Sequence, residues 1–350
     1  MGKHKKLRVA ISSGDINGIG LEVVLKTLSD ARVYEHCVPV IYASSSTVNF
    51  HMKTLSLEGL HYHQCNDAEH IDFNKINVLD IWKEKAFVEF GKVTTEAGGF
   101  AFASLKAAVE DLASNKMDVL VTAPINKANI QSDEFNFPGH TEYLASYANE
   151  ENPLMILAHD NLRVALVSGH LALKDVASSL SKSKIITKLE VFARSLSQDF
   201  GISRPRIAVL GLNPHNGDNG LMGDEETSII RPAIEEANRN GILAFGPFPA
   251  DGFFGSNARS KFDGVLAMYH DQGLAPFKAL SFDGGVNFTA GLPIVRTSPD
   301  HGTAYDIAGK GEADPTSFRN ALFMACDIYK QRKEHRELVA NALEFTNEKG

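Results

Sequence analysis

The chain has 350 residues, of which 43% are hydrophobic, and its formal net charge is −8. A chain of this length can form one large domain or two of ordinary size, and its hydrophobic content excludes intrinsic disorder. The acidic balance excludes nucleic acid or an anionic membrane surface as the main partner, because both require a dominant basic face. An anionic ligand would have to be held by a few basic side chains that gather at one site.

The cysteines and the amino-terminal segment favour a cytoplasmic location. Cys37, Cys65 and Cys326 are odd in number and have no CxxC spacing, which indicates free thiols in a reducing compartment. The first apolar run ends at Gly14 and Asp15, and it is too short for the core of a signal peptide. No apolar stretch reaches the roughly 18 residues that a membrane span requires.

Short β-rich runs alternate with helical patterns along the chain. The runs that predict strands buried on both faces are residues 7–12, 38–43, 76–81, 117–123, 162–168, 206–212 and 264–270. Amphipathic spacing predicts helices over 95–114 and 182–200. The segment from Pro315 onward is expected to be helical and to close over the first domain. This alternation is typical of an α/β protein with a largely parallel sheet.

Three histidines, His170, His215 and His270, come directly after three of these predicted strands. In open α/β sheets, ligands bind outside the carboxyl ends of the strands. Three imidazoles with open positions commonly hold a catalytic zinc, cobalt or iron ion. Each histidine alone is more often a structural or surface residue, but their shared placement favours a metal site. The sequence leaves open whether one subunit supplies all three.

Two further segments carry side chains suited to anions. In FPGHTEY, His140 and Thr141 lie where a helix is expected to begin, and its free N–H groups suit a phosphate or carboxylate. The alternative is that Thr141 only caps the helix. Farther along, Lys278 offers a point charge and Arg296, after a strand-like run, offers a planar fork, so the pair can bind phosphate and carboxylate. Solvation at the surface is the alternative for both.

Glycines shape the loops around these residues. A turn at Gly273 is expected to bring Lys278 back beside His270. The segment GDINGIG, residues 14–20, superficially resembles a dinucleotide-binding loop but does not fit GxGxxG. After His215, four acidic residues are interpreted as solvated side chains of a mobile turn: Asp218, Asp224, Glu225 and Glu226.

Taken together, these motifs resemble those of a known family. The chain carries, in order, GDINGIGLE, TAPINK, FPGHTEY, HLALKDV, GLNPHNGDNG, FPADGFF, YHDQGLAPFK and GVNFTAGLPIVRTSPDHGTAYDIAGKGEADPTSF. This series is similar to that of the 4-hydroxythreonine-4-phosphate dehydrogenases of pyridoxal phosphate biosynthesis. The resemblance implies an α/β fold like that of isocitrate and isopropylmalate dehydrogenases, with two α/β domains flanking an active-site cleft.

The domain organisation follows from the same resemblance. Residues 1–130 and 300–350 are expected to form the first α/β domain. Residues 131–299 are expected to form the second, which carries most metal and substrate residues. The family works as a homodimer with its active site at the subunit interface, so the second domain is also expected to supply that interface.

Matched motif to motif, the resemblance assigns roles to individual residues. The ligands of a divalent metal ion (zinc, magnesium or cobalt), shared between two subunits, are His170, His215 and His270. The substrate-binding residues are His140, Thr141, Lys278, Asn287 and Arg296. The segment 301–314 is similar to the loop that holds the adenosine part of NAD in the wider superfamily, and the cofactor contacts implied there are His301, Gly302, Asp306 and Asp314.

The implied reaction is the oxidation of 4-phosphooxy-L-threonine with NAD or NADP, followed by decarboxylation to 3-amino-2-oxopropyl phosphate. A metal ion bound by neutral imidazoles would lower the pKa of the alcohol and later polarise the ketone. We hypothesise that Lys278 or Asp271 helps to move the alcohol proton. Asp251, in FPADGFF, is a further candidate for positioning the amino group.

Two stretches depart from the usual pattern of the family. GDINGIGLE has Ile16, Asn17 and Leu21 where GDPAGIGPE is usual, which predicts a less rigid loop without the loss of a ligand. Residues 131–137 are slightly altered, so the geometry of the entrance near His140 stays open.

Three other functions are compatible with parts of the pattern. A paralogue could oxidise phosphorylated threonate or erythronate in sugar-acid catabolism, because one side-chain change can decide between an amine and a hydroxyl. A metal-dependent hydrolase built on three histidines would have no use for HGTAYDIAGKG. A non-catalytic phosphate-binding protein stabilised by metal would leave the nicotinamide unreduced.

Overall fold

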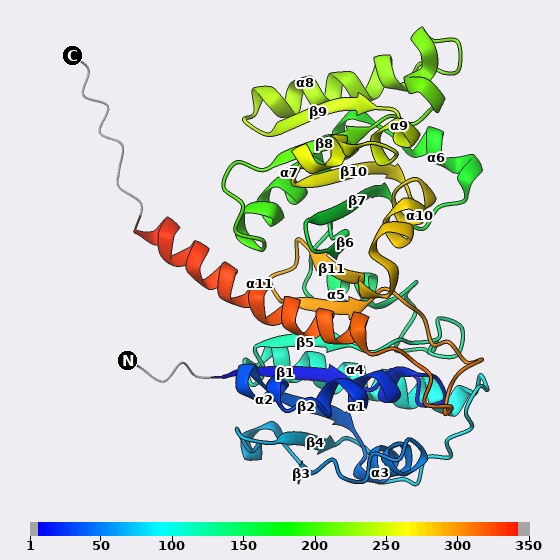
Figure 1. Cartoon of the computed structure of the whole chain (residues 1–350), viewed down its shortest axis with the longest axis vertical. Coiled ribbons are helices and arrows are strands. Elements are labelled where there is room, and N and C mark those ends of the chain that lie inside the picture. Colours follow the sequence, from blue (N-terminus) through cyan, green and yellow to red (C-terminus); the bar gives the residue numbers. More distant parts are fainter. Residues whose placement is uncertain (1–5, 342–350) are drawn as a thin grey trace.

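The computed structural model describes residues 6–341 as one twelve-stranded sheet with helices packed against it (Figure 1). The order of the strands is β3-β4-β2-β1-β5-β12-β11-β6-β7-β10-β8-β9. The strands are β1 (Leu7–Ser12), β2 (Cys37–Ala43), β3 (Tyr62–Cys65), β4 (Ile76–Asp80), β5 (Val119–Thr122), β6 (Leu154–His159), β7 (Leu162–Ser168), β8 (Arg206–Leu210), β9 (Leu243–Phe248), β10 (Gly264–Tyr269), β11 (Val286–Ala290) and β12 (Arg296–Pro299).

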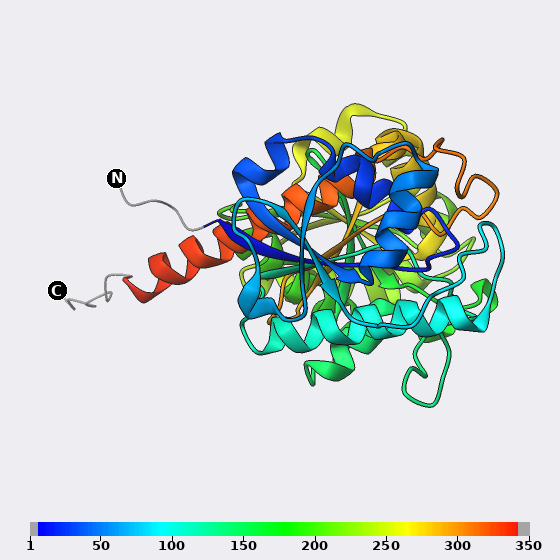
Figure 2. The same ribbon diagram turned by 90° about the horizontal axis from the view of Figure 1, so that it is seen from below.

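Helices connect most of the strands and cover both faces of the sheet. They are α1 (Gly20–Leu28), α2 (Arg32–His36), α3 (Ser45–Thr54), α4 (Thr95–Ala113), α5 (His140–Tyr147), α6 (Leu173–Ser179), α7 (Lys182–Gln198), α8 (Arg231–Arg239), α9 (Ala250–Phe254), α10 (His270–Ser281) and α11 (Thr316–Ala340). Seen from below, α4 lies on one face while α1 and α11 lie on the other (Figure 2). Each face therefore has its own apolar core.

The sheet consists of two parallel blocks joined by antiparallel strands. From β3 to β12 all neighbours are parallel, and so are the neighbours from β7 to β9. Between the blocks, β12–β11, β11–β6 and β6–β7 are antiparallel pairs. Segments that follow β5, β7 and β10 nevertheless line one pocket.

The sequence predicted the most apolar elements well. The runs 7–12 and 162–168 coincide with β1 and β7, and the other predicted runs correspond to β2, β4, β5, β8 and β10. The predicted α/β class is confirmed. The strands β3, β6, β9, β11 and β12 were not predicted. Helix α11 starts one residue after Pro315, which confirms the predicted helix, and it packs on β12 and β5. Its expected continuation beyond residue 341 lies outside the described residues, and its closing over the first domain stays a prediction.

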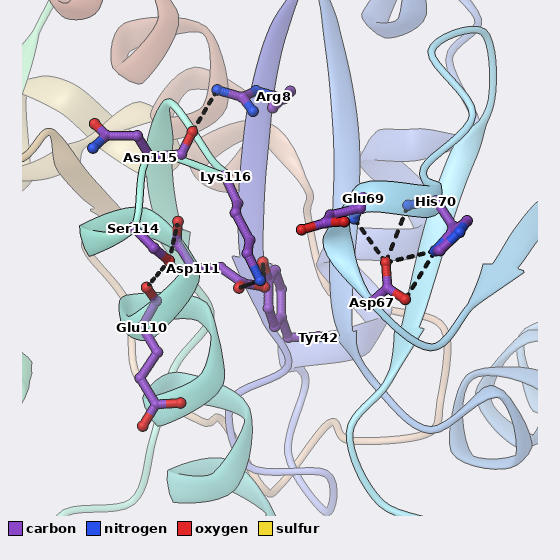
Figure 3. A network of polar contacts seen from close by, with 10 residues as sticks. All are labelled: Arg8, Tyr42, Asp67, Glu69, His70, Glu110, Asp111, Ser114, Asn115 and Lys116. Carbon is purple, nitrogen blue, oxygen red and sulfur yellow. Dashed lines mark hydrogen bonds and ion pairs between the residues drawn. The ribbon is translucent and has the colours of Figure 1, made fainter.

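A polar network fastens α4 to the first block of the sheet, away from the pocket (Figure 3). The Tyr42 hydroxyl donates to the Asp111 carboxylate at 2.8 Å, and the Arg8 guanidinium donates to the Asn115 carbonyl at 2.9 Å. Burial, followed by the charge of Asp111, raises the pKa of the Tyr42 phenol. The network has a structural role, because all of its members lie outside the pocket lining.

None of the helices between residues 6 and 341 combines the length and the apolar character that crossing a bilayer would demand. The three cysteines are free and buried. The division of the chain into two domains, with boundaries near residues 130 and 300, stays a prediction.

Candidate active site

A pocket of about 340 Å³, here called the central pocket, lies against the middle strands of the sheet. Its wall combines the segment after β5, the start of α5, residues of β6, β11 and β12, and the segments that follow β7 and β12. The predicted site residues that line it are His140, Thr141, His170, His270, Lys278, Asn287, Arg296, His301 and Gly302. The fold therefore brings together residues that are up to 162 positions apart in the sequence, from His140 to Gly302.

Arg296 carries a buried positive charge in this pocket. Its side chain is 2% exposed, and it begins β12 instead of following a strand as expected. The guanidinium donates to the Thr122 hydroxyl at 2.7 and 3.1 Å and to the Thr289 hydroxyl at 3.2 Å. Burial lowers its pKa to about 10, partly offset by the charge of Glu142. A buried cation whose partners are hydroxyls is costly, so the pocket is suited to an anion.

His140 lies deep beside this arginine. Burial is the main cause that lowers its pKa well below the usual value, and the charges of Arg296 and Lys127 act in the same direction. The ring is therefore neutral over the physiological range. Helix α5 has Gly139 at its N-cap and no side-chain cap. The interpretation of Thr141 as a mere cap is therefore wrong, and its hydroxyl stands in the pocket wall instead.

Three polar atoms of the pocket lining are buried without a hydrogen-bond partner among the described residues. They are His140 Nε2, Asn287 Oδ1 and His301 Nε2. Buried polar atoms in folded proteins are almost always paired. Unpaired atoms that gather around a single pocket with a buried arginine indicate a polar, anionic ligand.

Lys278 reaches the pocket from α10. Its Nζ atom donates to the Asp300 carbonyl at 2.7 Å and lies 3.7 Å from the Asp300 carboxylate. The side chain of Asp300 is 8% exposed, so it anchors the lysine at the wall.

The expected turn at Gly273 is wrong, because α10 runs unbroken from His270 to Ser281. A Cβ atom at Gly273 would lie 2.9 Å from side-chain atoms of Val164, Leu166 and Ala267. The glycine thus allows the helix to pack closely on the sheet. Lys278 follows His270 by eight residues, or roughly 12 Å along the helix axis.

His170 and His270 stand side by side, with ring centroids 6.2 Å apart. Both line the central pocket and also a second cavity of about 480 Å³, which includes Leu171, Leu173 and Asp271. Each ring has a carboxylate at its Nδ1 atom: Asp271 lies 2.7 Å from His270, and Glu142 lies 3.5 Å from His170. This pairing leaves both Nε2 atoms for another partner and resembles the carboxylate–histidine pairs behind metal ions.

The third predicted metal ligand lies elsewhere. His215 is exposed and lines neither cavity. Within residues 6–341 no three His, Cys, Asp or Glu side chains of one chain lie close enough to hold a metal ion. The donor set of one chain therefore fits two of the three expected ligands.

His215 belongs to an unusual left-handed turn. His215, Asn216, Gly217, Asp218, Asn219 and Gly220 all have positive φ angles, between 44° and 97°. Left-handed backbone is costly for residues with side chains, so outside contacts must hold it.

The buried carboxylate of Glu226 is the main support of this turn. Its side chain accepts hydrogen bonds from the backbone N–H groups of Leu212 and Asn213 at 2.7 and 2.6 Å. Glu226 is 1% exposed and begins a short π-helix, Glu226–Ile230. Its interpretation as a solvated acid is wrong, because it terminates a strand by accepting from the backbone.

The remaining predicted residues lie outside the central pocket. Asp271 lines only the second cavity, and Asp251 is exposed on α9. Asp306 is exposed in the loop before α11. Asp314 accepts a hydrogen bond from the Thr316 N–H group at 2.7 Å, and its interaction with Thr316 lowers its pKa. It therefore serves at least to start α11.

Sequence reasoning missed five polar residues of the pocket wall: Thr122, Lys127, Glu142, Ser298 and Asp300. Lys127 and Glu142 lie inside motifs that the sequence analysis singled out, TAPINK and FPGHTEY. Glu142 follows His140 by two residues at the start of one helix, and this proximity was an available signal. The hydroxyl of Thr122 gave none, because it ends an ordinary buried strand.

Comparison with known proteins decides the family. Residues 35–325 match the profile of a family described as "Pyridoxal phosphate biosynthetic protein PdxA". The chain belongs to the PdxA family. It is 49% identical over 342 residues to the 4-hydroxythreonine-4-phosphate dehydrogenase of Bacteroides thetaiotaomicron, covering 97% of this chain and 94% of that protein. The family resemblance drawn from the motifs is thereby confirmed.

Other PdxA relatives agree in fold and differ in name. The crystal structure of 4-hydroxythreonine-4-phosphate dehydrogenase from Klebsiella pneumoniae has a TM-score of 0.81 and 34% identity, with 93% of this chain and 100% of that chain covered. A protein of Oceanobacillus iheyensis, named provisionally as a D-threonate 4-phosphate dehydrogenase, is 38% identical over 327 residues, 93% of this chain and 98% of its own. The family thus includes more than one named substrate.

Proposed function

We propose that this protein is a 4-hydroxythreonine-4-phosphate dehydrogenase of pyridoxine 5'-phosphate biosynthesis. It oxidises 4-phosphooxy-L-threonine with NAD or NADP and releases carbon dioxide and 3-amino-2-oxopropyl phosphate. The observation that carries the proposal is the buried guanidinium of Arg296, which has hydroxyl partners, in a pocket with other cationic and unpaired polar groups. A small substrate with two anionic groups satisfies these residues. The names of the relatives at 49% and 34% identity support this choice.

The two anionic ends of the substrate need different partners. Phosphate carries up to two charges and suits Lys278 together with His140 and Thr141, which can donate hydrogen bonds. A carboxylate is planar and matches the fork of Arg296, with Asn287 steadying the adjacent atoms. This division holds the secondary alcohol between the two ends, close to His170 and His270.

Oxidation requires the alcohol proton and a hydride to leave together. The hydride passes from the carbinol carbon to the nicotinamide ring, the O–H proton passes to a base, and the resulting β-keto acid loses carbon dioxide. We favour Lys278 as the group that moves the proton, because it lines the pocket and the Asp271 carboxylate is engaged by His270.

The proposal includes a divalent metal ion, zinc, magnesium or cobalt, held by His170, His270 and the partner's copy of His215. When bound, such an ion would lower the pKa of the substrate alcohol and would polarise the ketone. The carboxylates of Glu142 and Asp271 orient the two imidazoles.

A homodimer follows from this ligand set. Exposed apolar side chains adjoin each histidine segment, Leu171 and Leu173 after His170 and Leu221 after His215, which suits a subunit interface. The exposed Asp251 would then reach the amino group of the substrate only in the site of the neighbouring subunit.

The proposed contacts to the nicotinamide cofactor are His301, Gly302, Asp306 and Asp314. The free cysteines suit a cytoplasmic enzyme.

One assay tests the proposal. Purified protein is incubated with NAD or NADP and either 4-phosphooxy-L-threonine, 4-phospho-D-threonate or 4-phospho-D-erythronate, and both reduced nicotinamide and carbon dioxide are measured before and after chelation. We expect equal amounts of both products with the amino acid, and their loss on chelation. Turnover with the threonate or erythronate alone would assign the paralogue's function. Release of inorganic phosphate without reduction would indicate a hydrolase, and no reaction with any compound would contradict an enzyme.

A further inference from the structure

The segment GDINGIGLE, residues 14–22, is adjacent to the loop between β12 and α11. This loop, residues 300–315, has neither helix nor strand. It is attached to residues 15–26 at two separate places. The proposed function leaves the role of GDINGIGLE unexplained, and these attachments supply one.

The first attachment joins the start of the loop to Asp15. The Tyr305 hydroxyl donates to the Asp15 carboxylate at 2.8 Å, and the Ile19 N–H group donates to the Thr303 carbonyl at 3.0 Å. Asp15 is fully buried, and the Asn129 amide donates to the same carboxylate oxygen at 2.7 Å. A Cβ atom at Gly18 would lie 2.8 Å from the Thr303 carbonyl oxygen. The motif therefore needs glycine at position 18 for the loop to approach.

The second attachment joins the end of the loop to α1. The Lys26 ammonium donates to the carbonyls of Gly311 and Ala313 at 2.7 Å each and to the Glu22 carboxylate at 2.9 Å. The same Glu22 oxygen accepts the Ala313 N–H group at 2.9 Å, and Glu22 is 1% exposed. One partly buried ion pair thus holds three backbone groups of the loop.

The loop requires such support, because parts of its backbone are unfavourable. Ala304 has a φ of 39°, which is uncommon for a residue with a side chain, and Gly309 and Gly311 are also left-handed. Between the two attachments Asp306 is exposed. The loop is therefore held at both ends while its middle faces outward, which is the arrangement expected of a preorganised binding surface.

We propose that Asp15 and the Glu22–Lys26 pair are positioning residues that hold the 301–314 loop in the conformation that binds the nicotinamide cofactor. The inference rests on the proposed function, which assigns this loop to NAD. When only a fraction of molecules has the competent loop, the apparent affinity for the cofactor falls by that fraction. The chemistry at the central pocket is left unchanged once the cofactor is bound, because Lys26 and Tyr305 do not line it.

The test compares Lys26→Met and Tyr305→Phe with the wild type and with Lys75→Met. Lys26→Met keeps the aliphatic length and removes the three hydrogen bonds, and Tyr305→Phe removes a single hydroxyl. Lys75 forms an exposed pair with Asp72 at 3.4 Å, beside β4, and serves as the control. NAD affinity is measured by titration calorimetry, the KM of each substrate and kcat by assay, and loop protection by hydrogen exchange.

We expect the Kd and KM for NAD to rise roughly tenfold in both variants, since each loses a hydrogen bond to a charged group. The kcat at saturating NAD and the KM of the phosphorylated acid should match the wild type, and amides of residues 303–313 should exchange faster. Wild-type NAD affinity in both variants would overturn the proposal, as would an equal loss of kcat with unchanged NAD affinity. A wild-type protein that binds neither NAD nor NADP would instead refute the proposed function on which the inference rests.

Discussion

The guanidinium of Arg296 and the hydroxyl of Thr122 are joined by two hydrogen bonds, from Nη2 at 2.7 Å and from Nε at 3.1 Å. A neutral oxygen thus occupies a position beside the guanidinium where a carboxylate would neutralise its charge. The pocket holds a positive charge whose natural counter-ion is the ligand. The free protein should therefore gain little stability from this arginine, while binding should depend on it.

The substitutions Arg296→Met and Arg332→Met should therefore change the free energy of unfolding to different extents. Arg332 is also buried, but its Nε atom lies 2.5 Å from the buried Asp199 carboxylate. Its removal leaves an unpaired buried charge and should lower the free energy of unfolding by about 3–5 kcal/mol. Arg296→Met leaves no carboxylate unpaired, so its unfolding free energy should stay within about 1 kcal/mol of the wild type or rise.

Urea denaturation of both variants measures the two free energies of unfolding, and a binding assay measures their affinity for the substrate. Arg296→Met should lose at least roughly a hundredfold in affinity for the phosphorylated substrate, since a bidentate charged contact is removed. A strong destabilisation by Arg296→Met would contradict the assignment of the ligand as the counter-ion of this arginine.

Asp271→Asn should weaken metal binding without unfolding the protein. The Asp271 carboxylate lies 2.7 Å from His270 Nδ1 and is 85% exposed, so it contributes little to stability. Loss of a carboxylate behind a histidine ligand typically reduces metal affinity about 10–100-fold. Equilibrium dialysis with zinc measures the change. Asp160→Asn is the matched control, because Asp160 is 86% exposed and lies 3.8 Å from His159 Nδ1, away from both cavities. Equal affinities for the two variants would contradict the proposal.

Two inactive variants should restore activity when they are combined. His170→Ala and His215→Ala each remove one proposed ligand. Each site of the proposed dimer takes His170 from one subunit and His215 from the other. In a mixed dimer, one of the two sites therefore has both histidines intact, and the other site has both replaced by alanine. Refolding an equal mixture should therefore regain roughly a quarter of wild-type sites, given random pairing of a C2 dimer. No recovery, with dimers formed normally, would place all three ligands in one subunit or exclude His215.

Acid should destabilise the protein through His51. This residue of α3 is fully buried against Phe90, and burial lowers its pKa from 6.5 to about 4. Above pH 6.5 the imidazole is neutral in both the folded and the unfolded state. Below pH 6.5 the unfolded chain binds a proton that the folded chain refuses, so stability falls as the pH drops toward 4.

His51→Leu should remove this part of the pH dependence. Between pH 6.5 and pH 5 the wild type should lose about 1.6 kcal/mol through His51, because the full slope of 1.36 kcal/mol for each pH unit is reached only once the unfolded imidazole is protonated. The variant should lose correspondingly less, which urea denaturation at the two pH values measures. Some decline should persist in the variant, because burial also lowers the pKa of His140. Identical slopes for both proteins would contradict the prediction.

The left-handed turn around His215 offers a matched pair of glycines. Gly217 and Gly220 have φ angles of 75° and 97°. A Cβ atom at Gly217 would lie 2.5 Å from the Gly223 carbonyl oxygen and 2.8 Å from the Glu226 carboxylate, whereas the space around Gly220 is open. Gly220→Ala should cost about 1–2 kcal/mol for the left-handed backbone alone.

Gly217→Ala should cost clearly more than Gly220→Ala and should also lower the zinc content of the purified protein, because the turn that carries His215 must shift. Denaturation and metal analysis of both variants measure these effects. If the two alanines have the same cost, the turn has more freedom than its contacts indicate.

The sequence predicted the elements whose signal is local. The runs that became β1, β7 and β10 are mostly apolar, so the burial of their central residues was readable without the fold. The strands β12 (RTSP) and β3 (YHQC) are short and polar, and they exist because neighbouring strands pair with them. Arg296 was therefore expected after a strand when in fact it begins one.

Many residues of the site could be predicted from the sequence, but the contacts between them could not. His140, Lys278 and Arg296 were recognised from motifs, and the fold brings all three to one pocket. The role of Glu226 was missed, since accepting two backbone N–H groups depends on contacts between segments that no local pattern encodes. Gly273 was misread for a similar reason, because the nearby side chains that demand a glycine come from β7 and β10.

The position of Arg296 at the start of β12 has a mechanical consequence. Strand β12 is the last of one parallel block, and its other neighbour, β11, begins the antiparallel stretch that leads to the second block. The arginine thus belongs to the first parallel block. Lys278 lies on α10, which packs on β7 and β10 of the second parallel block. A ligand that contacts both cations therefore connects the two blocks of the sheet. Its length should therefore set how far the two halves of the sheet can twist against each other.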